Sequence, residues 1–138
     1  PERISKEAVT ELIQGNTEIF FEVVLPYPQI DYWTGMKEKE FEEVMQIYRD
    51  VMGVVLSYGN AAVYSYGSEE WLVANSKNYA DKYNTNESVS EFLMCNTDDS
   101  HPYGVNLANA DNVFADYRRL YDGRCQNITK RQSGICRN

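Results

Sequence analysis

The chain has 138 residues, a length that fits one domain, and its 11 Tyr, 5 Phe and 2 Trp exclude a disordered protein. No apolar run approaches the ~20 residues needed to cross a bilayer, so we expect no membrane span. The formal net charge of −8 makes nucleic acid an unfavourable partner, because phosphates would be repelled.

Charge is distributed unevenly along the chain. Residues 1–117 contain 20 acidic and 7 basic side chains, a net charge of −13, whereas residues 118–138 contain one acid and six bases, a net charge of +5. Two interpretations follow from this asymmetry. The basic tail folds back onto the acidic body, or the acidic surface attracts a basic protein partner.

Hydrophobic spacing predicts a helix at the start of the chain. Ser5 is a suitable N-cap, and apolar residues at positions 9–24 keep roughly helical spacing. A Gly-Asn pair at 15–16 interrupts the pattern, so the alternative is a short helix followed by a strand over residues 19–25. The Pro-Tyr-Pro run at 26–28 ends regular structure, and a loop over residues 27–35 presents Tyr32 and Trp33.

The clearest periodicity spans residues 41–66, where apolar residues recur in steps of four and three and predict a long amphipathic helix. Gly53 and Gly59 fall within it, and each lowers helix stability by about 1 kcal/mol relative to Ala. We interpret both as points of close approach by a neighbouring helix. The alternative for residues 54–66 is a β-hairpin that turns at Gly59 and Asn60.

Three further helices are predicted in the second half of the chain. Ser68 can cap one that runs to about residue 83, residues 88–95 form a shorter one with Phe92 inward, and the last spans residues 108–121 and stops at Gly123. Residues 96–104 form a polar loop. The predicted fold is therefore all-α, an irregular bundle of about five helices in a single domain over residues 1–138, with one short β-hairpin as the alternative.

The three cysteines bear on the cellular compartment. Cys125 and Cys136 bracket a short polar segment, and a disulfide between them would close the basic C-terminal tail, residues 118–138, and contribute roughly 2–3 kcal/mol. Cys95 would then be a buried thiol. This pattern favours an exported protein, periplasmic or extracellular, and the alternative is a cytoplasmic protein with three reduced thiols.

No set of residues indicates catalysis, metal binding or a cofactor. His101 is the only histidine, and no nearby Ser or Cys stands in a nucleophile motif. The residues that follow Asn96 begin like a calcium loop, but His101 and Leu107 stand where that loop requires Gly and Glu. We therefore predict no catalytic residue, no metal ligand and no cofactor.

The function ranked first is an acidic protein-binding domain of the inhibitor or immunity-protein type, which neutralises a basic protein partner. Acids and aromatics in loops are the predicted contact residues, because loops lie on the surface. They are Asp98, Asp99, His101 and Tyr103 in one loop, and Tyr32 and Trp33 in another. The alternatives are a small exported hydrolase that uses carboxylates, and a structural or assembly subunit that forms a homo-oligomer.

Overall fold

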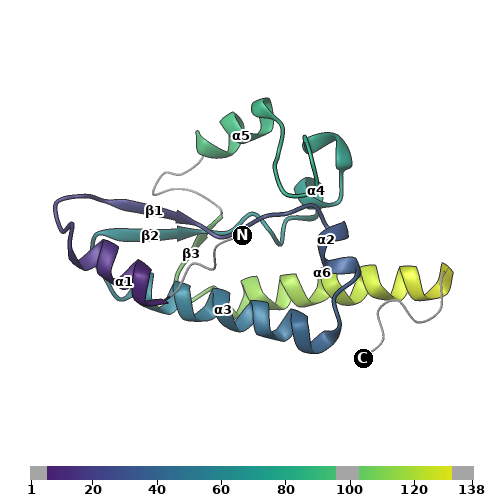
Figure 1. Cartoon of the computed structure of the whole chain (residues 1–138), viewed down its shortest axis with the longest axis horizontal. Helices are drawn as coiled ribbons and strands as arrows, with labels where there is room; N and C mark the ends of the chain where they lie inside the picture. Colours follow the sequence, from purple (N-terminus) through teal and green to yellow (C-terminus); the bar gives the residue numbers. More distant parts are fainter. Residues whose placement is uncertain (1–5, 96–102, 132–138) are drawn as a thin grey trace.

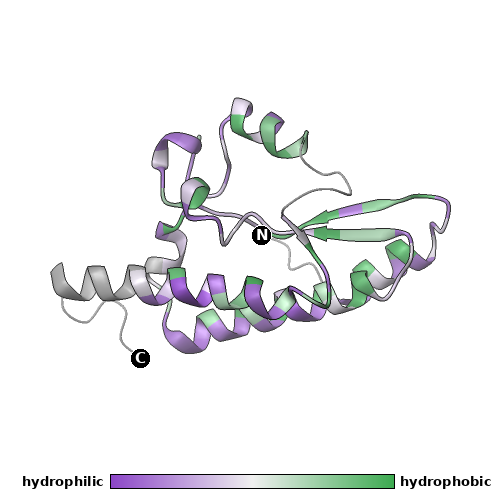
Figure 2. Cartoon of the chain, turned by 180° about the vertical axis from the view of Figure 1, so that it is seen from behind, coloured by the Kyte–Doolittle hydropathy of each residue, from purple (hydrophilic) through white to green (hydrophobic). Residues whose placement is uncertain are grey.

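The computed structural model describes residues 6–95 and 103–131. Three helices, α1 (Lys6–Gln14), α3 (Glu38–Leu56) and α6 (Ala110–Arg131), lie on one side of a small sheet in both views of the molecule (Figures 1 and 2). On the other side lies α5 (Glu87–Met94). The remaining helices are short: α2 (Asp31–Thr34), α4 (Glu70–Val73) and the 3-10 helix η1 (Ser76–Asn78).

The sheet has three strands in the order β1-β2-β3, so the predicted all-α fold is wrong. β1 (Phe21–Val24) pairs in parallel with β2 (Ala61–Tyr64), and β2 pairs antiparallel with β3 (Gly104–Val105). Figure 2 shows β1 and β2 as largely hydrophobic ribbons. The parallel pair requires a crossover, and α2 with α3 forms that connection.

Beyond the last turn of α3, residues 57–66 form neither the predicted helix nor the alternative hairpin. α3 ends at Leu56, where the Ser57 hydroxyl donates to the carbonyl of Val54 at 2.6 Å. The chain then turns and enters β2, whose parallel partner β1 lies 40 residues earlier in sequence. A strand of four residues contains too few positions to show a period of two, and its distant partner leaves no local signal.

The predicted helix over residues 19–25 is also wrong, and Asn60 shows why. Its side-chain amide donates to the carbonyls of Ile13, Asn16 and Ile19, at 3.4, 3.3 and 3.2 Å. Its backbone carbonyl accepts from the amide of Phe21 at 2.8 Å. Asn60 therefore joins the end of α1 to the start of β1. The Gly-Asn pair at residues 15–16 lies in the turn between this helix and this strand.

The predicted helix that starts at Ser68 is reduced to the single turn of α4. Glu69, and not Ser68, is the N-cap, and it makes no side-chain capping hydrogen bond. The Asn78 amide donates to the carbonyls of Trp71 and Leu72 at 3.2 and 3.1 Å, which satisfies acceptors that a longer helix would use itself. The Asn75 side chain accepts from the backbone amide of Lys77. Hydrogen bonds from side chains to the backbone thus take the place of helical hydrogen bonds in this segment.

The last two helices differ from prediction in their details. α5 coincides with the predicted helix over residues 88–95, but Phe92 is exposed, and so is Cys95, which we expected to be buried. α6 continues through Gly123 to Arg131, so this glycine is no helix stop. Gly53 and Gly59 approach nothing, because a Cβ atom at either site would meet no atom within 4 Å in the described residues.

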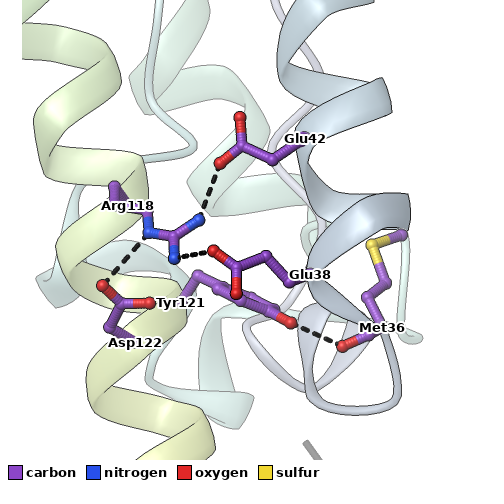
Figure 3. Close-up of polar contacts among 6 residues, drawn as sticks. All are labelled: Met36, Glu38, Glu42, Arg118, Tyr121 and Asp122. Atoms are coloured by element: carbon purple, nitrogen blue, oxygen red, sulfur yellow. Dashed lines mark hydrogen bonds and ion pairs between the residues drawn. The ribbon is translucent and has the colours of Figure 1, made fainter. Parts of the chain in front are cut away.

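α3 and α6 lie side by side, and Arg118 makes most of the described ion pairs between them (Figure 3). Arg118 pairs with Glu38, with Glu42 at 2.6 Å and with Asp122 at 3.1 Å. Beneath it, the Phe41 and Tyr121 rings stack with centroids 4.2 Å apart. The pairing fixes α3 against α6, and thereby positions the residues that α3 contributes to the candidate site.

Candidate functional site

A groove of about 1120 Å³ lies between α3 and the segment that connects η1 to α5. Tyrosine dominates its lining, and the remaining lining residues are proline, aliphatic or small and polar. The lining consists of Pro26, Tyr27, Pro28, Tyr32, Val44, Ile47, Tyr48, Tyr83, Asn84, Thr85 and Ser90. None of these residues carries a charge. Apolar, aromatic walls with a few polar groups are typical of ligand sites in proteins.

One wall of the groove is built by hydrogen bonds between two loops. The Tyr79 hydroxyl donates to the carbonyl of Tyr27 at 2.8 Å, and the Gln29 amide donates to the carbonyl of Lys82 at 3.0 Å. Burial, and then the neighbouring Tyr27, raises the pKa of Tyr79 well above its ordinary range, so its hydroxyl keeps the donated proton. The two loops therefore form one wall.

The tip of this wall is an Asx-type turn centred on Asp81. Its carboxylate accepts from the backbone amides of Tyr83 and Asn84 at 2.9 and 3.0 Å, and from the Asn84 side-chain amide. These hydrogen bonds, the one from the Asn84 side chain first, lower the pKa of Asp81. The turn presents Tyr83, 60% exposed, whose ring meets that of Tyr32 edge-on at 5.7 Å.

Tyr48 contributes a buried hydroxyl to the lining. Its side chain is only 8% exposed, and it makes no hydrogen bond within residues 6–95 and 103–131. Burial, followed by the proximity of Tyr117 and Tyr32, raises its pKa far above the ordinary value, so the hydroxyl stays protonated. A buried polar group without a protein partner is uncommon, so Tyr48 is a candidate for contact with an occupant of the groove.

Exposed carboxylates lie beside the parts of this uncharged lining that α3 and α5 contribute. Residues three or four apart on a helix share a face, so exposed Glu40 and Glu43 lie beside the lining residues of α3, and exposed Glu87 lies beside Ser90 on α5. We call Glu40, Glu43 and Glu87 the acidic rim. Two cations are adjacent in sequence to lining residues: Lys82 next to Tyr83, and Arg49 next to Tyr48. The acidic rim gives the groove mouth a negative potential.

The structure divides the predicted contact residues. Tyr32 lines the groove. Trp33 is 3% exposed and packs in the core against Phe41 and Tyr117, with no exposed surface for a partner. Tyr103 lies elsewhere, half-buried against Tyr66 and Trp71.

Several predictions fall on parts of the chain that the structure does not describe. The predicted contacts of Asp98, Asp99 and His101 lie outside the described residues. The predicted disulfide also does, because Cys136 lies beyond residue 131 and the described side chains of α6 end before Cys125. These predictions stand as they were made.

The predicted contact residues did not include Tyr27, Tyr48 or Tyr83, which are the other tyrosines of the groove. Tyr27 had a local signal, since the two flanking prolines place it in an irregular, surface-prone segment. Tyr48 had no such local signal, because it occupies a regular apolar position of α3 and is therefore predicted to lie in the core. Tyr83 reads as part of a helix face that the structure does not form.

The described residues contain no grouping of three or more His, Cys, Asp or Glu side chains suited to a metal ion. Glu69 has a raised pKa, caused by burial and then by Asp116, but it is not among the lining residues of the groove. Within the same ranges, no helix combines the length and apolarity required to traverse a lipid bilayer.

No protein-family model, no curated protein and no solved structure matches this chain.

Proposed function

We propose that this chain is a protein-binding domain, of the inhibitor type, that takes up a basic segment of a partner protein in the tyrosine groove. One observation carries the proposal. An uncharged, aromatic lining has the acidic rim beside it on α3 and α5, in a chain with a net charge of −8. Tyrosine buries large area at little cost in side-chain entropy, and the carboxylates attract a cationic partner and orient it.

A carboxylate hydrolase fits the groove less well. Such an enzyme places an acid and a base, or an acid and a nucleophile, on either side of the bond that it cleaves. The described lining of the groove contains no carboxylate. The groove therefore has aromatic walls for binding and lacks the acid–base pair that hydrolysis requires.

Two variants test whether the groove is the binding site. In Tyr32→Ala/Tyr83→Ala, the ring pair at the mouth of the groove is lost, whereas Tyr58→Ala removes a tyrosine that contacts Gln14 on α1. The probe is a fluorescein-labelled 12-residue peptide with a net charge of +4, titrated by anisotropy. We expect the double variant to weaken binding by about tenfold or more, and Tyr58→Ala to leave the affinity unchanged.

Nuclear magnetic resonance locates the bound peptide independently. On titration of the ¹⁵N-labelled chain with the same peptide, we expect the largest amide shifts at Tyr27, Tyr32 and residues 83–85, which line the groove. Shifts that spread evenly over every acidic helix face, together with full affinity in the double variant, would show that the peptide coats the charged surface and would refute the proposal.

A further inference from the structure

The chemistry of the groove also specifies the kind of segment that it binds. We infer that the segment is proline-rich and adopts the polyproline II conformation, with its basic residues beside the acidic rim. This inference rests on the proposed function, because it names the ligand class of the same groove. Three features of the groove carry it.

The first feature is the absence of charge from the described lining. A lysine or arginine head buried there would lose its hydration and gain no carboxylate partner, which is unfavourable. The part of the ligand that enters the groove is therefore apolar. The cationic residues of the ligand stay at the mouth, where Glu40 and Glu43 are exposed to water.

The second feature is the Tyr48 hydroxyl, which is buried, protonated and without a partner in the described residues. It requires a hydrogen-bond acceptor. A backbone carbonyl is the acceptor that any peptide can supply, provided that the peptide does not use it internally. The carbonyls of an α-helix are satisfied within the helix, whereas those of polyproline II are free.

The third feature is the shape and composition of the walls. None of the residues that line the groove lies in a strand, so the groove offers no sheet edge for an added β-strand. Tyr27, Tyr32 and Tyr83 instead offer ring faces and edges. Proline-rich segments bind aromatic-lined grooves in this way, because their rings pack on aromatics and their backbone is already ordered before binding.

The test uses three synthetic 12-residue peptides, each titrated calorimetrically against the whole chain. The first has four prolines, two of them spaced as Pro-x-x-Pro, and two arginines at one end. The second replaces every proline with alanine, and the third replaces both arginines with glutamine. We expect the first peptide to bind best, and each of the other two to bind at least about tenfold more weakly.

The two replacements separate the inference from the proposed function. If the alanine peptide binds as tightly as the first while the glutamine peptide is weakened, the basic partner stands and the polyproline II ligand is refuted. If arginine has no effect and proline does, the polyproline II ligand stands, whereas the basic partner and the contact of its basic residues with the acidic rim are refuted. If no peptide binds, both are refuted.

Tyr48→Phe tests the hydroxyl with the ring retained, and Tyr58→Phe is its matched control outside the groove. We expect Tyr48→Phe to weaken binding of the first peptide by about five- to tenfold and Tyr58→Phe to leave it unchanged. In the free protein, Tyr48→Phe should melt at the same temperature as the wild type or higher. A lower melting temperature, or an unchanged affinity, would overturn the role given to this hydroxyl.

Discussion

Gly67 occupies a position where the structure leaves no room for a side chain. A Cβ atom there would lie 2.5 Å from the Tyr117 hydroxyl and 2.8 Å from the carbonyl of Pro26. Tyr117 is buried, and its hydroxyl bonds that of Ser65 at 3.0 Å, so it has little freedom to move away. The close approach that we had assigned to Gly53 and Gly59 thus occurs at a different glycine.

Two alanine substitutions test this assignment in opposite directions. We expect Gly67→Ala to lower the free energy of unfolding by about 1–3 kcal/mol, because the methyl group overpacks the site. Gly53→Ala, within α3 and with open space around it, should raise the same free energy by about 0.5–1 kcal/mol through helix propensity. Urea denaturation measures both. Equal effects would show that Gly67 is not constrained by Tyr117.

Asp81 sets a pH dependence at the turn that carries Tyr83. Its pKa is lowered in the folded state, so its carboxylate stabilises the fold above the unfolded pKa, and this contribution is lost as the pH falls through the lower folded value. We expect Asp81→Ala to destabilise the protein at pH 7. The difference from the wild type should shrink below pH ~3.8 as the wild-type carboxylate becomes protonated. Urea unfolding of both proteins between pH 7 and pH 2.5 measures this difference, and a constant gap would contradict it.

Among the elements, the pairing of α3 with α6 depends on Arg118 more than on any other described ion pair. Arg118 contacts two acids on α3 and one on α6, and it lies over the Phe41 and Tyr121 rings. Tyr121 adds a hydrogen bond to the carbonyl of Met36 at 2.7 Å (Figure 3). The helices are thereby joined at the start of α3 through charge, stacking and a hydrogen bond together.

Alanine variants of two arginines on α6 measure how much Arg118 contributes to the pairing of α3 with α6. Arg118→Ala should lower the free energy of unfolding by about 1–2 kcal/mol, since several charge-assisted bonds and ring contacts are lost at a half-buried site. Arg119→Ala removes an exposed arginine whose ion pair within the described residues is with Asp116 of its own helix, and should cost at most about 0.5 kcal/mol. Both are measured by urea denaturation at low salt, and similar losses would argue against the interhelical role.

For the molecule as a whole, the important electrostatic feature is where the negative charge lies relative to the groove. A net charge of −8 repels anions and attracts cations from any direction, but only nearby carboxylates orient a ligand. The acidic rim contributes that local part. The wider acidic surface affects the rate of encounter, and salt screens both.

Variants that replace two glutamates with glutamines separate the effect of the acidic rim on binding from the effect of the overall net charge. Glu40→Gln/Glu43→Gln alters the rim, whereas Glu11→Gln/Glu18→Gln makes the same change in charge at exposed sites outside the groove lining. We expect the rim variant to bind the +4 peptide about fivefold more weakly, with an affinity that depends less on salt. The control variant should change the affinity little. Anisotropy titrations from 50 to 500 mM NaCl measure this. Equal losses in the two variants would mean that net charge, and not the rim, governs binding.

The sequence by itself determined the features that repeat over short distances. The apolar period of 3.6 predicts the body of α3, and apolar residues at helical spacing predict α5. Composition and charge determined the acidic surface and the expectation of a basic partner. These features are readable because each depends on neighbours within a turn or two of the same helix.

Tertiary structure alone decided the sheet and the groove. β1, β2 and β3 have four, four and two residues, so they exist only because Asn60 and the parallel register bring distant segments together. The groove likewise joins Tyr27, Tyr48 and Tyr83 from three separate segments, and Trp33 became core for the same reason. Side-chain burial depends on what packs against a residue from elsewhere in the chain, and that information is absent from any local window of sequence.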